Sequence, residues 1–389
     1  MKLLKSVISD TRRWGAALLP ALGVLICSLT APACESVYDD PNECLQGLAL
    51  RFVYEYHMMR GANAFTTHVD CVTLYVFDKQ GNYVTHQTET SEVLQDPNYR
   101  MILQLQPGEY DLVAYGGISC PAAKFDLTPN WNDPEVQATK NRADLQIELP
   151  RRYDNTSSDP LFLLDVNPHD NKGGLFYGAR SLTMPDTKHK SGYIEETVEM
   201  MNDVNDITVI LQELDKPAQI NYADYEVKIV DDNFRLDCNN NVIESGDGEQ
   251  KPAYLPYFAD NITVGYVDVD DLPRNGEYRE PDESDRVQVA CAEFSTSRLV
   301  MKHITSARLI ISRKNDTEHE HDIIDVPLIE YLLMCWTYND RRWMKDEQEF
   351  LDRQNNWTLI FFMQHGLWWD SIISINNWVV RLNNIDDFE

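Results

Sequence analysis

Cys34 is the residue whose surroundings point most clearly to chemistry. Four basic residues open the chain, and an apolar run from Trp14 to Leu29 follows them. Small residues then lead to Ala33, which completes the usual order of a secretory signal. At about 16 residues, the run is shorter than the roughly 20 that a helix needs to cross a bilayer. We therefore expect cleavage between Ala33 and Cys34 and attachment of lipid to the Cys34 thiol.

The sequence around this cysteine departs from the usual lipoprotein pattern. Ala31 and Pro32 stand where a leucine and a small residue are usual. Cys27 is a rival acceptor, but Ile26 before it is too bulky for the signal peptidase. The alternative is simple secretion, with cleavage after Ala33 and no lipid. Both interpretations predict export, and the first predicts a lipoprotein on the outer face of the outer membrane.

A histidine pair is one candidate metal site. Within Glu318–Asp322, His319 and His321 are two residues apart and would share a face of an extended chain. Two imidazoles can ligate a metal ion. The same letters are typical of a polar hairpin tip between two strands, and we favour that interpretation.

Two groups of carboxylates also raise the question of a metal. Asp237–Asn241 carries the first three oxygen positions of a calcium-binding loop. Val242 stands where the sharp-turn glycine belongs, and Gly248 stands where the bidentate glutamate belongs. In Val267–Asp271, acids alternate with valines as in an edge strand. We predict no metal and no cofactor.

The chain contains no common catalytic motif. A phosphate-binding glycine loop, the zinc helix motif HExxH and the nucleophile elbow GxSxG are all missing from the sequence. Trp368, Trp369 and Trp378 could stack on sugar rings, although such residues more often pack in a core or at a sheet edge. A non-enzymatic protein is therefore expected, with glycan binding as an alternative function.

Charge and cysteine content narrow the partners. The 389 residues carry a net charge of −29, so the chain should repel nucleic acid. An exported protein meets an oxidising compartment, where disulfides can form. Cys71 and Cys335 lie in apolar runs and are expected to be small buried residues. Six cysteines follow Cys34, and their pairing stays open: Cys44, Cys71, Cys120, Cys238, Cys291 and Cys335.

The elements that position these residues are predicted to be mostly short β-strands. Apolar residues alternate along Leu48–Tyr56, and Cys71–Phe77 is apolar on both faces, as expected of a strand between two layers. Pro107-Gly108 indicates a hairpin turn. Further strands of the first half are expected at Met101–Leu105, Tyr110–Tyr115, Leu145–Leu149, Leu175–Ala179 and Ile207–Leu211.

A second series of strands begins after Asp215. Its members are expected at Tyr225–Val230, Ile262–Val267, Arg298–Met301, Ala307–Ile311, Trp357–Phe362 and Trp378–Leu382. Helices are expected at Leu328–Trp336 and Asp346–Asp352, and surface insertions at Pro121–Ala143 and Phe234–Ala259. We expect a signal peptide at 1–33, a lipidated tether at 34–44 and two β-sandwich domains at 45–214 and 215–389.

Several stretches, taken in order, resemble one family. After Cys44 they are Leu50–Tyr56, Val69–Asp78, Gly108–Gly117, Asp159–Phe162, Leu175–Gly178, Phe294–Leu299, Tyr331-Leu332, Glu349–Arg353 and Ile375–Val380. Together they resemble the FimB-type fimbrial anchor and minor-subunit lipoproteins of type V pili. Tyr115 departs from the tryptophan that is frequent in that family, and the insert near Phe234–Ala259 is long.

The resemblance implies an all-β fold of two tandem transthyretin-like antiparallel sandwiches. It also implies a surface-exposed outer-membrane location and assembly with fimbrial subunits by β-strand complementation, without catalysis. Host or bacterial surface ligands are further candidate partners. The first strand, Leu48–Tyr56, lies close to the lipid on Cys34, so a cut after Arg60 would release the body from the membrane. We therefore expect that strand to be retained, and the protein to sit at the base of the fibre and limit its length.

Overall fold

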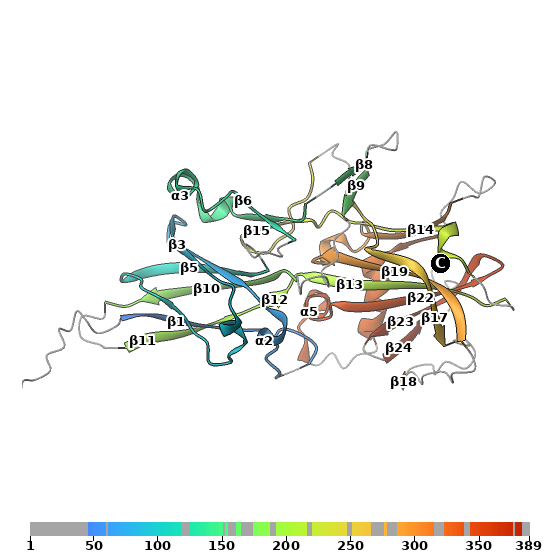
Figure 1. The fold of residues 1–389 in the computed structure, drawn as a ribbon, viewed down its shortest axis with the longest axis horizontal. Helices are drawn as coiled ribbons and strands as arrows, with labels where there is room; N and C mark the ends of the chain where they lie inside the picture. The colour runs from blue at the N-terminus through green and yellow to red at the C-terminus, as the bar shows by residue number, and fades with distance from the viewer. Residues whose placement is uncertain are drawn as a thin grey trace, which may run out of the picture.

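The computed structural model describes residues 46–59, 61–117, 124–150, 152–154, 161–164, 174–186, 192–215, 220–246, 251–265, 276–277, 286–314, 323–337, 343–375 and 378–382. These residues form an elongated molecule in which five sheets are accompanied by short helices (Figure 1). The all-β prediction is confirmed. No helix in this part of the chain is long and apolar enough to cross a membrane.

Three of the sheets form one half of the molecule. The first has the order β11 (Gly192–Glu199), β1 (Gln46–Val53), β4 (Met101–Leu103). The second has the order β12 (Met201–Asn202), β10 (Phe176–Met184), β5 (Gly108–Gly116), β2 (Val72–Asp78), β3 (Tyr83–Glu89). The third has the order β15 (Arg235–Asp237), β7 (Gln146–Glu148), β6 (Asp126–Thr128).

Two larger sheets hold the remaining strands. One has the order β17 (Phe258–Gly265), β19 (Arg286–Ser297), β13 (Val204–Glu213), β22 (Asn356–Gln364), β23 (Leu367–Ile375), β24 (Trp378–Leu382), β18 (Gly276–Glu277). The other has the order β21 (Ile324–Pro327), β20 (Arg308–Arg313), β14 (Tyr225–Val230), β16 (Ala253–Tyr254), β9 (Leu161–Leu164), β8 (Arg152–Asp154).

The helices are short. The α-helices are α2 (Phe65–His68), α3 (Pro134–Thr139), α4 (Leu328–Leu333) and α5 (Glu347–Arg353). The 3₁₀ turns are η1 (Glu92–Gln95), η2 (Arg142–Asp144), η4 (Tyr222–Asp224), η5 (Met301–His303) and η6 (Met334–Thr337). Both predicted helices are confirmed, because α4 with η6 covers the first and α5 covers the second.

β2 is buried on both faces, as the sequence predicts. Leu74 and Val76 belong to a core between the second sheet and the first, whereas Tyr75 and Phe77 belong to a core on the opposite face. That opposite core includes Ile147 of β7, so the third sheet supplies the second cover. Alternate residues of a strand point to opposite faces, which is why one apolar run can serve two cores.

The segment Phe234–Ala259 is not the surface insertion that we expected. It contributes β15, β16 and the start of β17, and Phe234, Leu236 and Tyr254 are buried. Its apolar residues are spaced among polar ones, so its average composition hides the strands. Likewise, Arg298–Met301 is not a strand, because β19 ends at Ser297 and the chain then enters η5.

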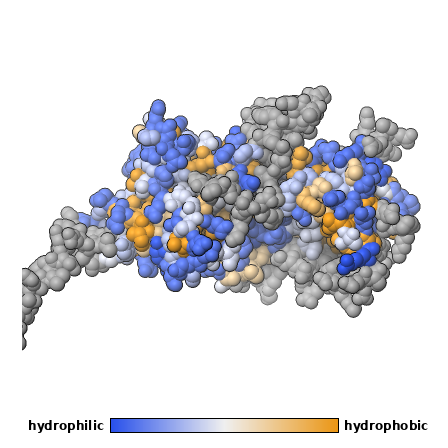
Figure 2. Space-filling model, viewed as in Figure 1, coloured by the Kyte–Doolittle hydropathy of each residue, from blue (hydrophilic) through white to orange (hydrophobic). Residues whose placement is uncertain are grey.

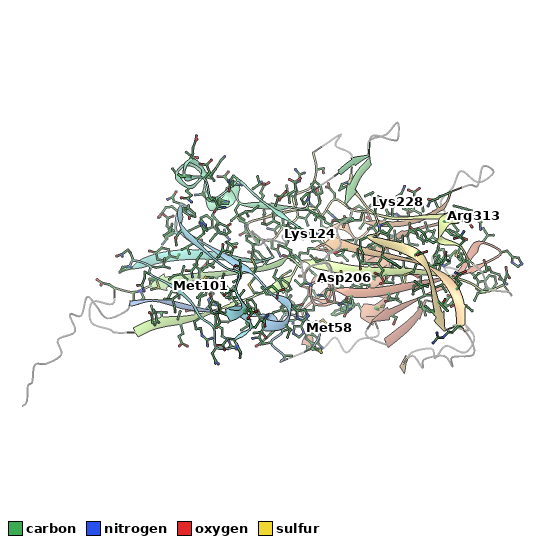
Figure 3. The ribbon with its side chains drawn as sticks, in the orientation of Figure 1. Met58, Met101, Lys124, Asp206, Lys228 and Arg313 are labelled. Carbon is green, nitrogen blue, oxygen red and sulfur yellow. The ribbon has the colours of Figure 1, made fainter. Side chains whose placement is uncertain are left out.

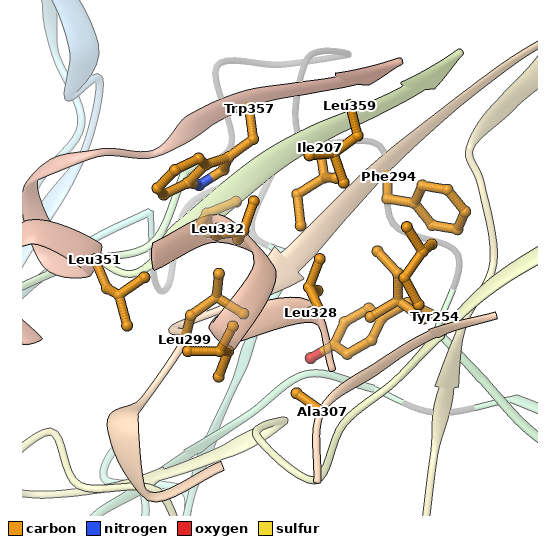
Figure 4. Close-up of a cluster of buried hydrophobic side chains, with 14 of the residues drawn as sticks. Ile207, Tyr254, Phe294, Leu299, Ala307, Leu328, Leu332, Leu351, Trp357 and Leu359 are labelled. Carbon is orange, nitrogen blue, oxygen red and sulfur yellow. The ribbon is translucent and has the colours of Figure 1, made fainter. Parts of the chain in front are cut away.

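The larger core lies under β13 and β22, which pair in parallel (Figure 4). Leu328 and Leu332 of α4 pack beneath Ile207 of β13 and Trp357 of β22 in this core. β13 also pairs with β19, so this strand joins the later part of the chain although it precedes residue 215. Two other connections also cross residue 215, because β9 pairs with β16 and β15 pairs with β7. Sheet membership therefore does not divide the chain at one point, and the two-domain division at residue 215 stays a prediction.

Candidate functional site

β1 is the central strand of its sheet. It pairs in parallel with β11 and antiparallel with β4. Leu48, Leu50 and Phe52 point into the core, as the alternation predicts. Beyond the strand, the amide of Met200 donates to the carbonyl of Val53 at 2.7 Å, which continues the pairing to the end of β1. β1 is therefore held on both edges and on one face.

The chain turns immediately after β1. The amide of Tyr54 donates to Oδ1 of Asn63 at 2.9 Å, and Nε2 of His57 lies 2.8 Å from the carbonyl of Ala62. The Tyr54 ring contacts the rings of His57 and Phe176 edge-on, with centroids 5.0 and 5.2 Å away. Figure 3 shows Met58, which lies in this turn, near the middle of the molecule. The turn therefore places the end of β1 where the two halves meet.

Helix α5, from the other half, contacts this turn through Arg353. The guanidinium of Arg353 lies 3.9 Å from the centroid of the Tyr56 ring and faces the carbonyls of Glu55 and His57 at 3.5 Å each. Its Nε also donates to Glu349 at 2.7 Å, one helical turn earlier. Asp346 caps the helix by accepting from the Glu349 amide at 3.0 Å. The cap and the (i, i+4) ion pair fix the direction of the arginine.

Arg298 links α5 to the loop after β15. Its Nε and Nη2 donate to the two carboxylate oxygens of Asp352 at 2.8 Å each, and its Nη1 donates to the carbonyl of Asn240. Gln348 also donates to Asp352, at 2.9 Å. Bidentate pairs of this kind combine strength with a fixed geometry. Burial lowers the pKa of Arg298, but Asp352 more than offsets this, so the pKa is raised.

Asp203 completes the group that we call the junction cluster: Asp203, Asn240, Arg298, Asp352 and Arg353. Its amide donates to the carbonyl of Leu175 at 2.8 Å, and its Oδ1 accepts from Nδ2 of Asn240 at 2.8 Å. Burial raises the pKa of Asp203 to about 7, against the opposing effects of Arg298 and Asn240. The residues of this cluster bond several segments of the chain to one another.

A buried histidine forms a second cluster that the sequence does not reveal. Nδ1 of His303 lies 2.6 Å from Asp231, and Nε2 lies 3.2 Å from Glu244. Burial lowers the pKa of His303, but its two carboxylate partners raise the pKa by more than burial lowers it, so the net shift is upward. Both ring nitrogens face carboxylates, which favours the doubly protonated ring. Such a ring cannot take a proton from a nucleophile, so this cluster favours a structural role.

The calcium-like stretch Asp237–Asn241 forms a turn. Oδ1 of Asp237 accepts from the amides of Asn239 and Asn241 at 2.8 Å each, and Asn240 has a positive φ of 64°. The side chain thus caps its own loop, as Asp does in Asx turns. Within the described residues, no group of three or more metal-ligating side chains occurs. Ala33, Cys34, the pair His319 and His321, and the stretch 267–271 lie outside the described residues.

Trp368 and Trp369, two adjacent tryptophans of β23, have different surroundings. Trp368 packs edge-on against Phe361, with ring centroids 5.9 Å apart, and its Nε1 donates to the carbonyl of Asp370. Trp369 is the extra residue of a β-bulge and is 55% exposed. The side chain of Trp378 lies outside the described part. Two adjacent rings with different surroundings give weak support for sugar stacking.

The cysteines need one correction. Cys71 is buried, as expected, but it is disulfide-bonded and so is not simply a small apolar residue. Cys238, Cys291 and Cys335 are buried thiols that form no disulfide, and the burial of Cys335 confirms the expectation for that residue. Cysteine type and spacing alone could not separate the paired from the free residues.

The fold and these clusters define an all-β protein in which buried polar groups hold strands in place, with a mainly hydrophilic surface on the face in Figure 2. A family model described as fimbrillin-A associated anchor proteins Mfa1 and Mfa2 matches residues 40–384. The chain belongs to this family. It is accordingly a fimbrial accessory protein associated with the fimbrium, and the family resemblance seen in the sequence is confirmed.

Solved structures agree with this assignment. A candidate adhesin from Bacteroides thetaiotaomicron shares 37% identity and a TM-score of 0.67, covering 87% of this chain and 98% of that one. A candidate polysaccharide-binding protein from the same species shares the fold at 24% identity and a TM-score of 0.64, covering 87% and 99%. The fimbrial anchor protein Mfa2 of Porphyromonas gingivalis shares the fold at 14% identity and a TM-score of 0.57, with the same coverage. No curated protein matches.

Proposed function

We propose that this protein is a non-enzymatic fimbrial anchor or accessory subunit, attached to the outer membrane by lipid on Cys34. The observation that carries the proposal is the place of β1. The strand that follows the tether is the central strand of its sheet, and α5 grips the turn at its end through Arg353. A protein built to stay attached needs such a retained first strand.

Removal of β1 would be costly. Leu48, Leu50 and Phe52 would each lose about 1.5–3 kcal/mol of burial free energy. β11 and β4 would also lose the partner that they share, which leaves backbone donors and acceptors unpaired. The sheet therefore has its lowest free energy when β1 stays in place, because its backbone hydrogen bonds and its buried side chains are then kept.

The lipid and β1 belong to one short stretch of chain. The roughly 12 residues from Cys34 to the start of β1 span at most about 40 Å when extended. A cut beyond β1, for example after Arg60, would separate the body from the lipid. Lipid anchorage and loss of the first strand therefore exclude one another, and the retained protein would end the fibre at the membrane and limit its growth.

Fimbrial subunits are the proposed partners. They would join by β-strand addition, in which an incoming strand satisfies the unpaired backbone of a sheet edge. Among the described strands, β3 and β17 lie at the edges of their sheets. Glycan binding has less support, because Trp368 packs against Phe361 and only Trp369 of the two is well exposed.

Membrane attachment is tested by replacing the lipid acceptor. The Cys34→Ala variant should incorporate no labelled palmitate and should leave the membrane fraction or remain uncleaved. Cys27→Ala is the matched control and should be labelled and retained like the wild type. Labelling of the Cys34→Ala protein would show that the lipid site has been assigned to the wrong cysteine.

A further inference from the structure

The single residue between two sheets is a buried acid. β12 of the five-stranded sheet ends at Asn202, and β13 of the seven-stranded sheet begins at Val204, so only Asp203 separates them. The Asp203 side chain is fully buried. A change in its charge would therefore be felt at the point where one sheet passes into the other.

Asp203 and the side-chain amide of Asn240 share one hydrogen bond, where two could form. Nδ2 of Asn240 donates to Oδ1 of Asp203 at 2.8 Å. Oδ2 of Asp203 and Oδ1 of Asn240 are both buried and have no hydrogen-bond partner among the described residues. Two acceptors cannot satisfy one another, and buried acceptors without donors are costly. One proton on Asp203 would supply the missing donor and close a two-bond ring between the acid and the amide.

The surroundings of Asp203 favour this neutral form. The charged groups that face it are Arg298, at the end of β19, and Asp352, on α5. These two are bound to each other at 2.8 Å through both carboxylate oxygens, so the arginine charge is already engaged. Within the described part of the chain, Asp203 also interacts with phenols on three other segments, namely Tyr54, Tyr115 and Tyr177.

We propose that Asp203 and Asn240 form a proton-dependent lock between the two halves of the molecule. With the proton bound, the acid and the amide share two hydrogen bonds and no net charge is buried at the joint. When the proton leaves, one bond is lost and a carboxylate is left facing an amide oxygen. The joint then loosens around Asp203, and this affects the nearby Tyr54 at the end of β1.

The pKa of about 7 fixes the direction of the effect. Between the ordinary aspartate pKa of about 4 and about 7, the folded protein holds a proton that the unfolded chain has released, so stability falls as pH rises. Asp203→Asn replaces the acid by an amide that can form both bonds at every pH. The unfolding constant of the wild type, divided by that of Asp203→Asn, should rise by up to about tenfold per pH unit in this range.

The same ratio for Asp325→Asn, an exposed carboxylate paired with Arg308, should not change in this way. A pH-independent ratio for Asp203→Asn would overturn the proposal. A second measurement does not depend on whether the variant folds. Infrared difference spectra of the full wild-type chain between pH 6 and pH 8 should show a protonated carboxyl band that disappears with a midpoint near 7. If no carboxyl titrates in that interval, the lock does not exist.

Discussion

At the scale of single residues, the buried polar groups of this protein stabilise contacts rather than catalyse reactions. His303 is the clearest case, because Asp231 and Glu244 face its two ring nitrogens. Its raised folded-state pKa means that the stabilisation is complete below the ordinary histidine pKa of about 6.5 and is lost as pH rises through the folded value. The burial-raised pKa of Asp231 acts in the same direction.

The His303→Gln variant should therefore be less stable than the wild type by roughly 2–3 kcal/mol near pH 6, with a smaller deficit near pH 9. Chemical denaturation at both pH values measures the two deficits. Lys302→Gln is the control, because Lys302 is exposed and pairs only with Glu244 in the described structure. A deficit for His303→Gln that is equal at both pH values, or larger at pH 9, would mean that the ring is not held in its charged form.

At the scale of elements, Arg353 of α5 holds the turn at the end of β1 in place. Arg353→Met keeps the apolar stem of the side chain but removes the charge over Tyr56 and the donors to Glu55 and His57. A loss of about 1–2 kcal/mol should speed local opening about 5- to 30-fold. Amide hydrogen exchange over residues 52–58 measures this opening.

Lys345→Met, which changes an exposed cation just before α5, should leave that exchange unchanged. Unfolding of the whole chain should be followed in parallel. If Arg353→Met speeds exchange equally in β1 and in β14, far from the contact, the arginine supports the fold in general and does not grip the first strand.

The elements were predictable from local patterns, whereas the junction cluster was not. β2 follows from a continuous apolar run and β14 from apolar alternation, and both patterns depend on neighbouring residues alone. Asp203 and Asn240 are 37 residues apart, and Arg298 and Asp352 are 54 residues apart. Only the pairing of sheets brings these residues together. Phe234–Ala259 looked like an insertion because its strands β15 and β16 are only three and two residues long. Strands this short show no clear periodicity, and only their pairing with distant strands reveals them.

At the scale of the whole molecule, the proposed anchor consists of a tether, a retained first strand and a body that meets fimbrial subunits. β1 lies directly after the tether and inside the sheet, and the C-terminal half secures its end through α5. The anchor role follows only if the membrane-bound protein still contains β1. Its place in the fibre is therefore decided by where the mature chain begins.

Mass spectrometry of the protein recovered from cell membranes tests this claim most directly. We predict a chain that begins at an acylated Cys34 and includes the peptide Leu48–Tyr56. Arg60, after which a cut would release the body from the lipid, lies outside the described residues. A membrane-retained form that begins after Arg60 would contradict the anchor role and would place this protein in the body or at the tip of the fibre.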